Sequence, residues 1–348
     1  MNQTIIHGGD IATASTIYGI AAQHWIDLST GINPRNYPFA PPSLASYRDL
    51  PYPREDFIQA AANFYGSSQF VATAGSQSVI QALPQLLADL PLLLPAVGYQ
   101  EYRYQWQLQG RTVVDYTAFD GDAMVAAIDA KLANNPAQHI VVIRPNNPTG
   151  VWINNQQLLH WANQLSQGAY LIVDEAFIEA EQEDSLLNSA LPDNCIVLRS
   201  FGKFFGLAGI RLGFVFASSK LRDVLHNGMG LWAANGVAQS IATQAFNDKA
   251  WQRQALININ EDKQASCEAL YQPLEQYAEN AVHKPLFSTY RMAKEQAEKV
   301  YQAFAQEGVL LRLIDVDESC AFIRAGRVAT NSRAMQRLQA LSKKVSTC

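Results

Sequence analysis

The sequence predicts an α/β protein with a three-layer architecture, in which a mostly parallel sheet carries helices on both faces, plus a smaller α+β domain at the C-terminal end. The first observation is a series of short, nearly unbroken apolar runs, at His139–Arg144, Tyr170–Asp174, Cys195–Arg199 and Gly213–Ala217. Such runs are typical of strands buried on both faces, and strands that alternate with helices favour a doubly wound sheet. The second observation is size. A chain of 348 residues, 48% of them hydrophobic, is longer than a single hydrophobic core usually accommodates, which favours two domains.

The elements follow one another in a clear order. The first forty residues look too irregular for a domain, so we expect an N-terminal arm over residues 1–40. Phe70–Ala74 predicts a short strand that turns into a helix through Gly75, Ser76 and Gln77, where free N–H groups could meet a phosphate. The turn 145–150 leads into a helix at Asn154–Gln167, which Gly168 ends. These elements place the large domain at residues 41–240.

The remaining chain predicts the smaller domain at residues 241–348. A long, polar helical stretch runs from about residue 236 to Tyr277, and short strands then alternate with amphipathic helices that end near Val345.

Composition excludes several functional classes. The net charge is −5 and the basic residues are scattered, so we expect no nucleic-acid partner. Four cysteines lie far apart without metal-binding spacing, which indicates reduced thiols and no metal site. No apolar run reaches the roughly 18 residues of a membrane span, and the N-terminus has no secretory pattern. We therefore expect a cytoplasmic protein without membrane contact.

A single lysine carries the strongest chemical signal. Lys203 lies in SFGKFFGLAGIR, residues 200–211, between glycines that would admit a bulky ligand. A lysine amine has a pKa of about 10.4 in water and becomes a nucleophile only where its neutral form is favoured. Ser200 and Arg211 could bind a phosphate, and Asn147 and Asp174 follow neighbouring strands. Taken alone, Lys203 is equally consistent with a solvated turn residue.

Together and in this order, these motifs resemble the fold-type I pyridoxal phosphate enzymes, the aspartate aminotransferase superfamily. The resemblance implies pyridoxal 5′-phosphate as cofactor, with Lys203 as Schiff-base lysine, Asp174 as partner of the pyridine nitrogen and Asn147 as donor to ring oxygen O3′. It also implies further cofactor contacts: a phosphate site at Gly75, Ser76, Gln77, Ser200 and Arg211, and a stacking aromatic at Tyr99, with Tyr102 as the alternative. Finally, it implies a homodimer in which Tyr52 contributes to the phosphate site of the neighbouring subunit.

Within the superfamily, the chain resembles the branch of histidinol-phosphate aminotransferases and threonine-phosphate decarboxylases. The segments 7–10 (HGGD) and 27–34 (DLSTGINP) resemble the arm of the decarboxylases, and Phe177 replaces a tyrosine that is typical of the aminotransferases. Gly31 departs from the decarboxylase pattern, which has asparagine there. The resemblance implies that a phosphorylated amino acid is bound by His7, Gly8, Gly31, Asn147, Arg312 and Arg324. Two guanidiniums suit its carboxylate and phosphate.

The reaction that this resemblance implies is decarboxylation of L-threonine O-3-phosphate to (R)-1-aminopropan-2-ol O-2-phosphate, a step of cobalamin synthesis. Three alternatives stay open. One is an aminotransferase that acts on histidinol phosphate or a related phosphorylated compound. The others are a non-catalytic pyridoxal-sensing module and an α/β binding protein without a cofactor. Asp10 and Glu175 are expected to be structural.

Overall fold

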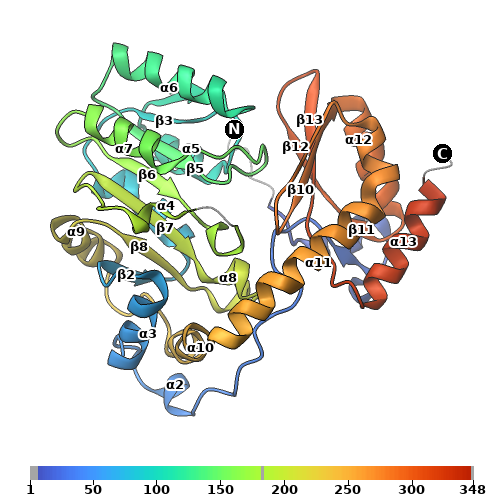
Figure 1. Cartoon of the computed structure of the whole chain (residues 1–348), viewed down its shortest axis with the longest axis horizontal. Helices are drawn as coiled ribbons and strands as arrows, with labels where there is room; N and C mark the ends of the chain where they lie inside the picture. Colours follow the sequence, from blue (N-terminus) through green and yellow to red (C-terminus); the bar gives the residue numbers. More distant parts are fainter. Residues whose placement is uncertain (1–6, 182–183, 346–348) are drawn as a thin grey trace. The chain divides into compact units, whose positions relative to one another are not determined.

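The structure of the chain, a computed structural model, describes residues 7–181 and 184–345. These residues form two compact units (Figure 1). The large unit comprises Asn36–Arg253, and the small unit comprises the described residues up to Arg35 and from Gln254 onward. The domain boundaries expected at residues 40 and 240 stay predictions. The second unit boundary falls inside a continuous helix, α11 (Lys249–Leu274), which no break in the sequence pattern marks.

The large unit is built on a seven-stranded sheet with the order β2-β8-β7-β6-β5-β3-β4. The strands are β2 (Phe70–Thr73), β3 (Leu92–Pro95), β4 (Val113–Tyr116), β5 (His139–Ile143), β6 (Leu171–Asp174), β7 (Cys195–Ser200) and β8 (Gly213–Phe216). Among the described strands of this sheet, β8 alone runs in the opposite direction to the other six, so its pairings with β2 and β7 are antiparallel. Its connection to β7 holds just the four-residue helix α8 (Phe201–Phe204) and a 3-10 turn, which is too short for the usual helical crossover of parallel strands.

Helices cover both faces of this sheet because side chains of a strand point alternately to its two sides. On one face, Ile172 packs with apolar side chains of α4 (Ser76–Leu86), α5 (Glu101–Leu108) and α9 (Ser219–Met229). The remaining helices of the unit are α2 (Ala45–Arg48), α3 (Glu55–Tyr65), α6 (Gly121–Asn134), α7 (Asn155–Gln164) and α10 (Gly236–Asn247). The predicted α/β class, with its mostly parallel sheet, is thereby confirmed.

Two predicted helices have different limits in the structure. Asn154 is the N-cap of α7, since its Oδ1 accepts from the Gln157 N–H at 2.9 Å, and the helix ends at Gln164. The helical stretch predicted from about residue 236 to Tyr277 is two helices, α10 and α11. They are divided at Asp248, whose side chain accepts from the Trp251 N–H at 2.9 Å.

The small unit contains a four-stranded antiparallel sheet with the order β12-β13-β10-β9. Its strands are β9 (Asn280–His283), β10 (Ser288–Ala293), β12 (Arg312–Asp315) and β13 (Cys320–Ala325), and its later helices are α12 (Lys294–Gln306) and α13 (Arg333–Val345). The N-terminal segment joins this unit through β1 (Ile26–Asp27), which pairs in parallel with β11 (Val309–Leu310). A bidentate ion pair from Arg35 to the buried Asp262 adds a second link.

The N-terminal segment contains a helix that the sequence analysis did not predict, α1 (Ile11–Tyr18). Asp10 caps it by accepting from the Thr13 N–H at 3.0 Å, and Gly19, with φ of 67°, ends it. Asp10 and Gly19 are the sequence features from which this helix could have been predicted. The expected structural role of Asp10 is confirmed.

No helix within residues 7–181 and 184–345 is long and apolar enough to cross a membrane.

Candidate active site

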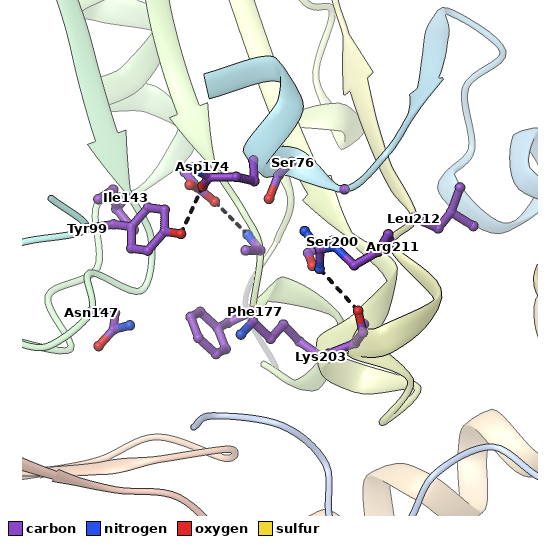
Figure 2. A pocket seen from close by; sticks show the side chains of 15 residues that line it. Ser76, Tyr99, Ile143, Asn147, Asp174, Phe177, Ser200, Lys203, Arg211 and Leu212 are labelled. Carbon is purple, nitrogen blue, oxygen red and sulfur yellow. Dashed lines mark hydrogen bonds between the residues drawn. The ribbon is translucent and has the colours of Figure 1, made fainter. Parts of the chain in front are cut away.

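Nine of the predicted site residues line one cavity of about 150 Å³ in the large unit (Figure 2). They lie on turns at the carboxyl ends of the sheet strands, or close to these ends, where ligands of doubly wound folds bind. They are Gly75, Ser76, Gln77, Tyr99, Asn147, Asp174, Ser200, Lys203 and Arg211. Six lining residues were not predicted to bind the cofactor: Ile143, Ala176, Phe177, Gly202, Ala208 and Leu212.

One end of the cavity is suited to an anion. Gly75, with φ of 81°, is the N-cap of α4 and offers no side chain, so the first N–H groups of this helix are not capped by a side chain. The Arg211 guanidinium lies close by, because a Cβ atom at Gly75 would be 2.8 Å from Arg211 Nη2. Backbone N–H groups, the positive end of a helix dipole and a guanidinium together favour a phosphate.

The position of this helix start depends on Gly213, at the beginning of β8. A Cβ atom there would lie 2.5 Å from the Ser76 nitrogen and 2.7 Å from the Gly75 carbonyl carbon. Only glycine therefore lets β8 approach the turn closely.

Asp174 also lines the cavity and is almost fully buried. Its carboxylate accepts from the Tyr102 hydroxyl at 2.9 Å and from the Ala176 N–H at 3.0 Å. Burial raises the pKa of Asp174, while these two hydrogen bonds and the charge of Lys203 oppose the shift. A cation bound to this carboxylate would stabilise its ionised form further.

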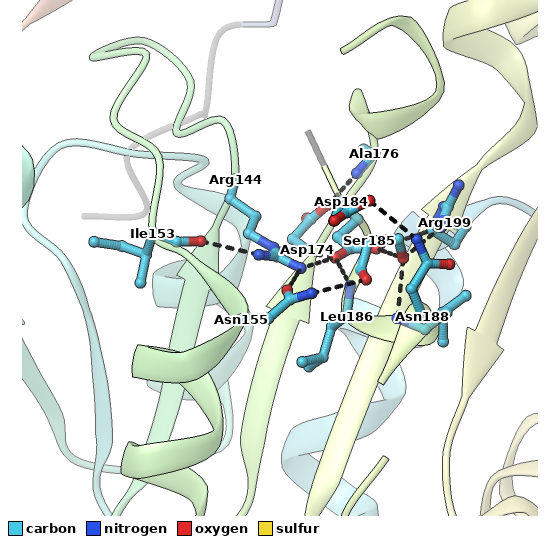
Figure 3. Close-up of polar contacts among 12 residues, drawn as sticks. Arg144, Ile153, Asn155, Asp174, Ala176, Asp184, Ser185, Leu186, Asn188 and Arg199 are labelled. Atoms are coloured by element: carbon cyan, nitrogen blue, oxygen red, sulfur yellow. Dashed lines mark hydrogen bonds and ion pairs between the residues drawn. The ribbon is translucent and has the colours of Figure 1, made fainter. Parts of the chain in front are cut away.

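A buried ionic network holds the strand ends behind Asp174 (Figure 3). Glu175 accepts from Arg144 Nε at 3.0 Å, from Arg199 at 3.3 Å and from the Ser185 hydroxyl at 2.6 Å. The Arg144 N–H also donates to the carbonyl of Asp174 at 2.9 Å. The expected structural role of Glu175 is confirmed, since its carboxylate is used in this network.

Asn147, Phe177, Lys203 and Tyr99 also line the cavity. Asn147 Oδ1 is buried and has no hydrogen-bond partner in the described part of the chain. Lys203 Nζ lies 5.3 Å from the centre of the Phe177 ring. The Tyr99 hydroxyl donates to Gln77 Oε1 at 2.9 Å. Tyr102, the alternative stacking residue, is fully buried and does not line the cavity. Its hydroxyl donates to Asp174 instead.

The predicted substrate arginines lie directly opposite each other on neighbouring strands of the small unit. Arg312 of β12 is the register partner of Arg324 of β13. Burial, and then the charge of Arg312, lowers the pKa of Arg324 to about 10, and burial also lowers that of Arg312. Arg324 Nε is buried and has no partner among the described residues. Two desolvated like charges at paired positions favour a bound anion.

The N-terminal motif packs against the same arginine. Arg324 Nη2 donates to the Ser29 carbonyl, and the Gly9 N–H donates to Ser29 Oγ at 2.7 Å. A Cβ atom at Gly8 would lie 2.2 Å from the Ser29 oxygen. His7 is exposed, and Gly31 is buried in the loop after β1. Ser29 was missed as a site-forming residue, although it lies within the motif at residues 27–34.

Tyr52 lies outside the Lys203 cavity. It lines a second cavity of the large unit, of about 480 Å³, with its ring 6.0 Å from that of Trp232. Tyr52 and Leu231 are each about 60% exposed there.

Comparison with known proteins decides the family. The family described as aminotransferase class I and II matches residues 42–339. The chain belongs to this family. The match also confirms the predicted superfamily and its pyridoxal phosphate cofactor.

Several known enzymes are similar in sequence to long segments of this chain. A threonine-phosphate decarboxylase of Pseudomonas aeruginosa is 35% identical over 71% of this chain and 72% of its own length. One from a Sinorhizobium species is 38% identical over 70% and 72%. A histidinol-phosphate aminotransferase of Bacillus cereus is 30% identical over 53% and 51%.

Solved structures show the same fold. The histidinol-phosphate aminotransferase of Sinorhizobium meliloti, solved with pyridoxal 5′-phosphate, superposes with a TM-score of 0.76 over 99% of this chain and 96% of its own, at 19% identity.

The residues of the cavity fit this cofactor. The Gly75–Arg211 cradle suits its phosphate, and the buried Asp174 carboxylate suits a protonated ring nitrogen. The amide of Asn147, with its unused oxygen, is available to the ring substituents.

Proposed function

We propose that this enzyme decarboxylates L-threonine O-3-phosphate to (R)-1-aminopropan-2-ol O-2-phosphate. Support comes from the two threonine-phosphate decarboxylases, which are 35% and 38% identical. The observation that carries the proposal is the cross-strand pair Arg312 and Arg324. Two adjacent, desolvated guanidiniums suit a substrate with two anionic groups, a carboxylate and a phosphate.

The proposed roles of the cavity residues come from the resemblance to the family, and their positions around one cavity support them. Gly75, Ser76, Gln77, Ser200 and Arg211 hold the cofactor phosphate, Asp174 pairs with the ring nitrogen, and Asn147 orients the ring. When bound, pyridoxal phosphate withdraws electrons from the substrate's α-carbon and so stabilises the charge left by departing carbon dioxide. Lys203 Nζ returns a proton to that carbon.

Phe177 distinguishes this cavity from that of typical aminotransferases of the branch. Its buried ring lines the cavity near Lys203 and carries no hydroxyl that could bond to ring oxygen O3′. Ring oxygen O3′ would then receive its side-chain hydrogen bond from the Asn147 amide. At Gly31, where the decarboxylase pattern has asparagine, we propose that backbone groups or water contact the substrate.

The decisive experiment separates the type of reaction from specificity. Purified holoenzyme is incubated with phosphothreonine, phosphoserine, threonine or histidinol phosphate, and carbon dioxide and carbonyl products are measured. We expect one carbon dioxide per phosphothreonine without an amino acceptor. A stoichiometric keto acid that forms only with an amino acceptor would contradict the proposal. A Lys203→Ala control should lose activity and the borohydride-sensitive colour of the cofactor.

An aminotransferase acting on histidinol phosphate is the second candidate, favoured by the Bacillus cereus relative at 30% identity. Histidinol phosphate has no carboxylate, so it would leave one guanidinium of the pair without its proposed anion. Amino-acceptor-dependent loss of histidinol phosphate in the same panel would favour this candidate.

We further propose that the enzyme is a cytoplasmic homodimer in which Tyr52 serves the phosphate site of the other subunit. The support is the exposed apolar rim around Tyr52, Leu231 and Trp232, which a second copy of the chain could cover.

A further inference from the structure

A second chemically distinctive cluster lies in the small unit. Cys267 on α11 contacts His283, at the end of β9, and Ser288, at the start of β10. The distances from Cys267 Sγ are 3.5 Å to His283 Nδ1 and 3.5 Å to Ser288 Oγ. On the far side of the imidazole, Glu275 Oε2 lies 3.7 Å from His283 Nε2. A carboxylate, an imidazole and a thiol are therefore arranged in a row.

The hydrogen bonds of Ser288 indicate where its proton points. Its oxygen lies 2.8 Å from His283 Nδ1 and accepts from Arg327 Nη1 at 2.9 Å. If His283 is protonated, its Nδ1–H is shared between Ser288 Oγ and Cys267 Sγ. Arg327 Nη1 also donates to Ser288 Oγ, so the hydroxyl proton of Ser288 is left for Cys267 Sγ. This arrangement stabilises a thiolate.

Arg327 supplies a further reason for negative charge at the sulfur. Its guanidinium is buried, and the acceptors of its hydrogen bonds within the described residues are neutral: Ser288 Oγ and the carbonyls of Lys284 and Pro285. A buried cation is costly without a nearby anion. A thiolate at Cys267, one hydroxyl away, provides such an anion, and Asp262 acts on Arg327 in the same direction but more weakly.

The ionisation behaviour agrees with this geometry. Burial by itself would raise the pKa of Cys267, but the hydrogen bond with His283, the charge of Arg327 and the Ser288 hydroxyl outweigh it and lower this pKa to about 7. Hydrogen bonding with Cys267 in turn raises the pKa of His283. Cys195 is buried without such partners, and its pKa is raised to about 12.

The sulfur is also reachable. Cys267 is partly exposed and lines a cavity of about 460 Å³. The other lining residues are Asn260, Lys263, Gln264, Glu268 and His283. The titratable groups near the thiol among the described residues include Lys263 and Glu268 from α11, His283 with Glu275, Tyr290 from β10, and Arg327, on which Asp262 also acts.

We propose that Cys267 is a reactive thiolate site that forms mixed disulfides with low-molecular-weight disulfides. In this exchange, Cys267 Sγ attacks one sulfur of the small disulfide and a new S–S bond forms. The original S–S bond breaks, and the other half leaves as a thiolate that takes up a proton. Cys267 is oxidised to the disulfide level, and the departing half is reduced. Neither Lys203 nor any residue of its cavity takes part.

The test uses native holoenzyme and 4,4′-dithiodipyridine over a range of pH. Cys348, which lies outside the described residues, is replaced by serine in every protein compared. We expect one fast-reacting thiol whose rate rises through about pH 7, with the adduct located on the Cys267 peptide by mass spectrometry. Cys267→Ser should abolish the fast phase, whereas the matched variant Cys320→Ser should retain it.

His283→Gln keeps the thiol but removes its charged partner. We expect the pH midpoint to move up towards the roughly 8.5 of an ordinary thiol, and the rate at pH 6 to fall roughly fivefold. Circular dichroism and cofactor absorbance check the fold of each variant, and the wild-type adduct map and pH profile decide the question independently. A fast phase that survives in Cys267→Ser, an adduct on Cys195 or Cys320, or an unchanged midpoint in His283→Gln would overturn the proposal.

Discussion

At the scale of single residues, Tyr102 supports Asp174 from outside the cavity through the hydrogen bond that its buried hydroxyl donates. Tyr102→Phe removes a hydrogen bond to the ionised carboxylate, and such bonds contribute about 1.5–3 kcal/mol. The neutral form of Asp174 becomes more favourable, so the apoprotein should bind pyridoxal phosphate roughly tenfold or more weakly. Spectroscopic titration with the cofactor measures this loss. Tyr116→Phe, which removes a buried hydroxyl bonded to the Val141 carbonyl, is the matched control and should bind normally.

The paired arginines make a second prediction at this scale. Arg324→Gln keeps a donor near the Ser29 carbonyl but removes a charge, so we expect the KM for phosphothreonine to rise about tenfold or more. The affinity for cofactor should not change, which titration can verify. Arg222→Gln loses an arginine bonded to the Ala217 carbonyl and should keep a normal KM. Equal effects of both substitutions would contradict a substrate role for Arg324.

At the scale of elements, the contact between β8 and the start of α4 sets the phosphate end of the cavity. A methyl group at Gly213 would collide with the backbone of Gly75 and Ser76, and such overpacking costs about 1–3 kcal/mol. Gly213→Ala should therefore lower the melting temperature and weaken binding of pyridoxal phosphate more than that of pyridoxal. Gly209→Ala adds the same methyl group in open space and should change neither. If Gly213→Ala weakens the binding of pyridoxal phosphate and of pyridoxal equally, the substitution has not altered the phosphate end of the cavity, and the prediction is contradicted.

At the scale of the whole molecule, the exposed apolar rim predicts self-association. Leu231→Glu places a charge on this rim, so the proposed dimer should dissociate at micromolar concentration. Sedimentation velocity measures the masses of both proteins. Leu108→Glu, at a leucine that is 56% exposed and does not line the second cavity, should leave the dimer intact. A wild-type protein with the mass of a single chain would contradict the homodimer.

Local patterns in the sequence were sufficient for much of the fold, and the resemblance to a known superfamily supplied most residues of the large-unit cavity. Apolar runs predicted β5, β6 and β7, since continuous hydrophobicity reports burial on both faces. The antiparallel direction of β8 was not predicted, because it depends on the short connection from β7. The division between α10 and α11 at Asp248 was also not predicted, because it depends on one helix cap. The helix α1 was missed although Asp10 and Gly19 bound it.

The sequence by itself determined the type of fold, because apolar runs that alternate with helices indicate a doubly wound sheet. It also implied the cofactor, because Asn147, Asp174, Ser200, Lys203 and Arg211 occur in an order that resembles a known superfamily. Only the tertiary structure showed that Tyr102 supports Asp174 and that Gly213 lies against Ser76. Within the small unit, only the strand register showed that Arg312 lies opposite Arg324. The tertiary structure also revealed the Cys267 cluster, in which sequence spacing carries no signal. The physical reason is that hydrogen bonds, close approaches and desolvated charges join residues far apart in the chain, and pairing across strands and helices alone brings them together.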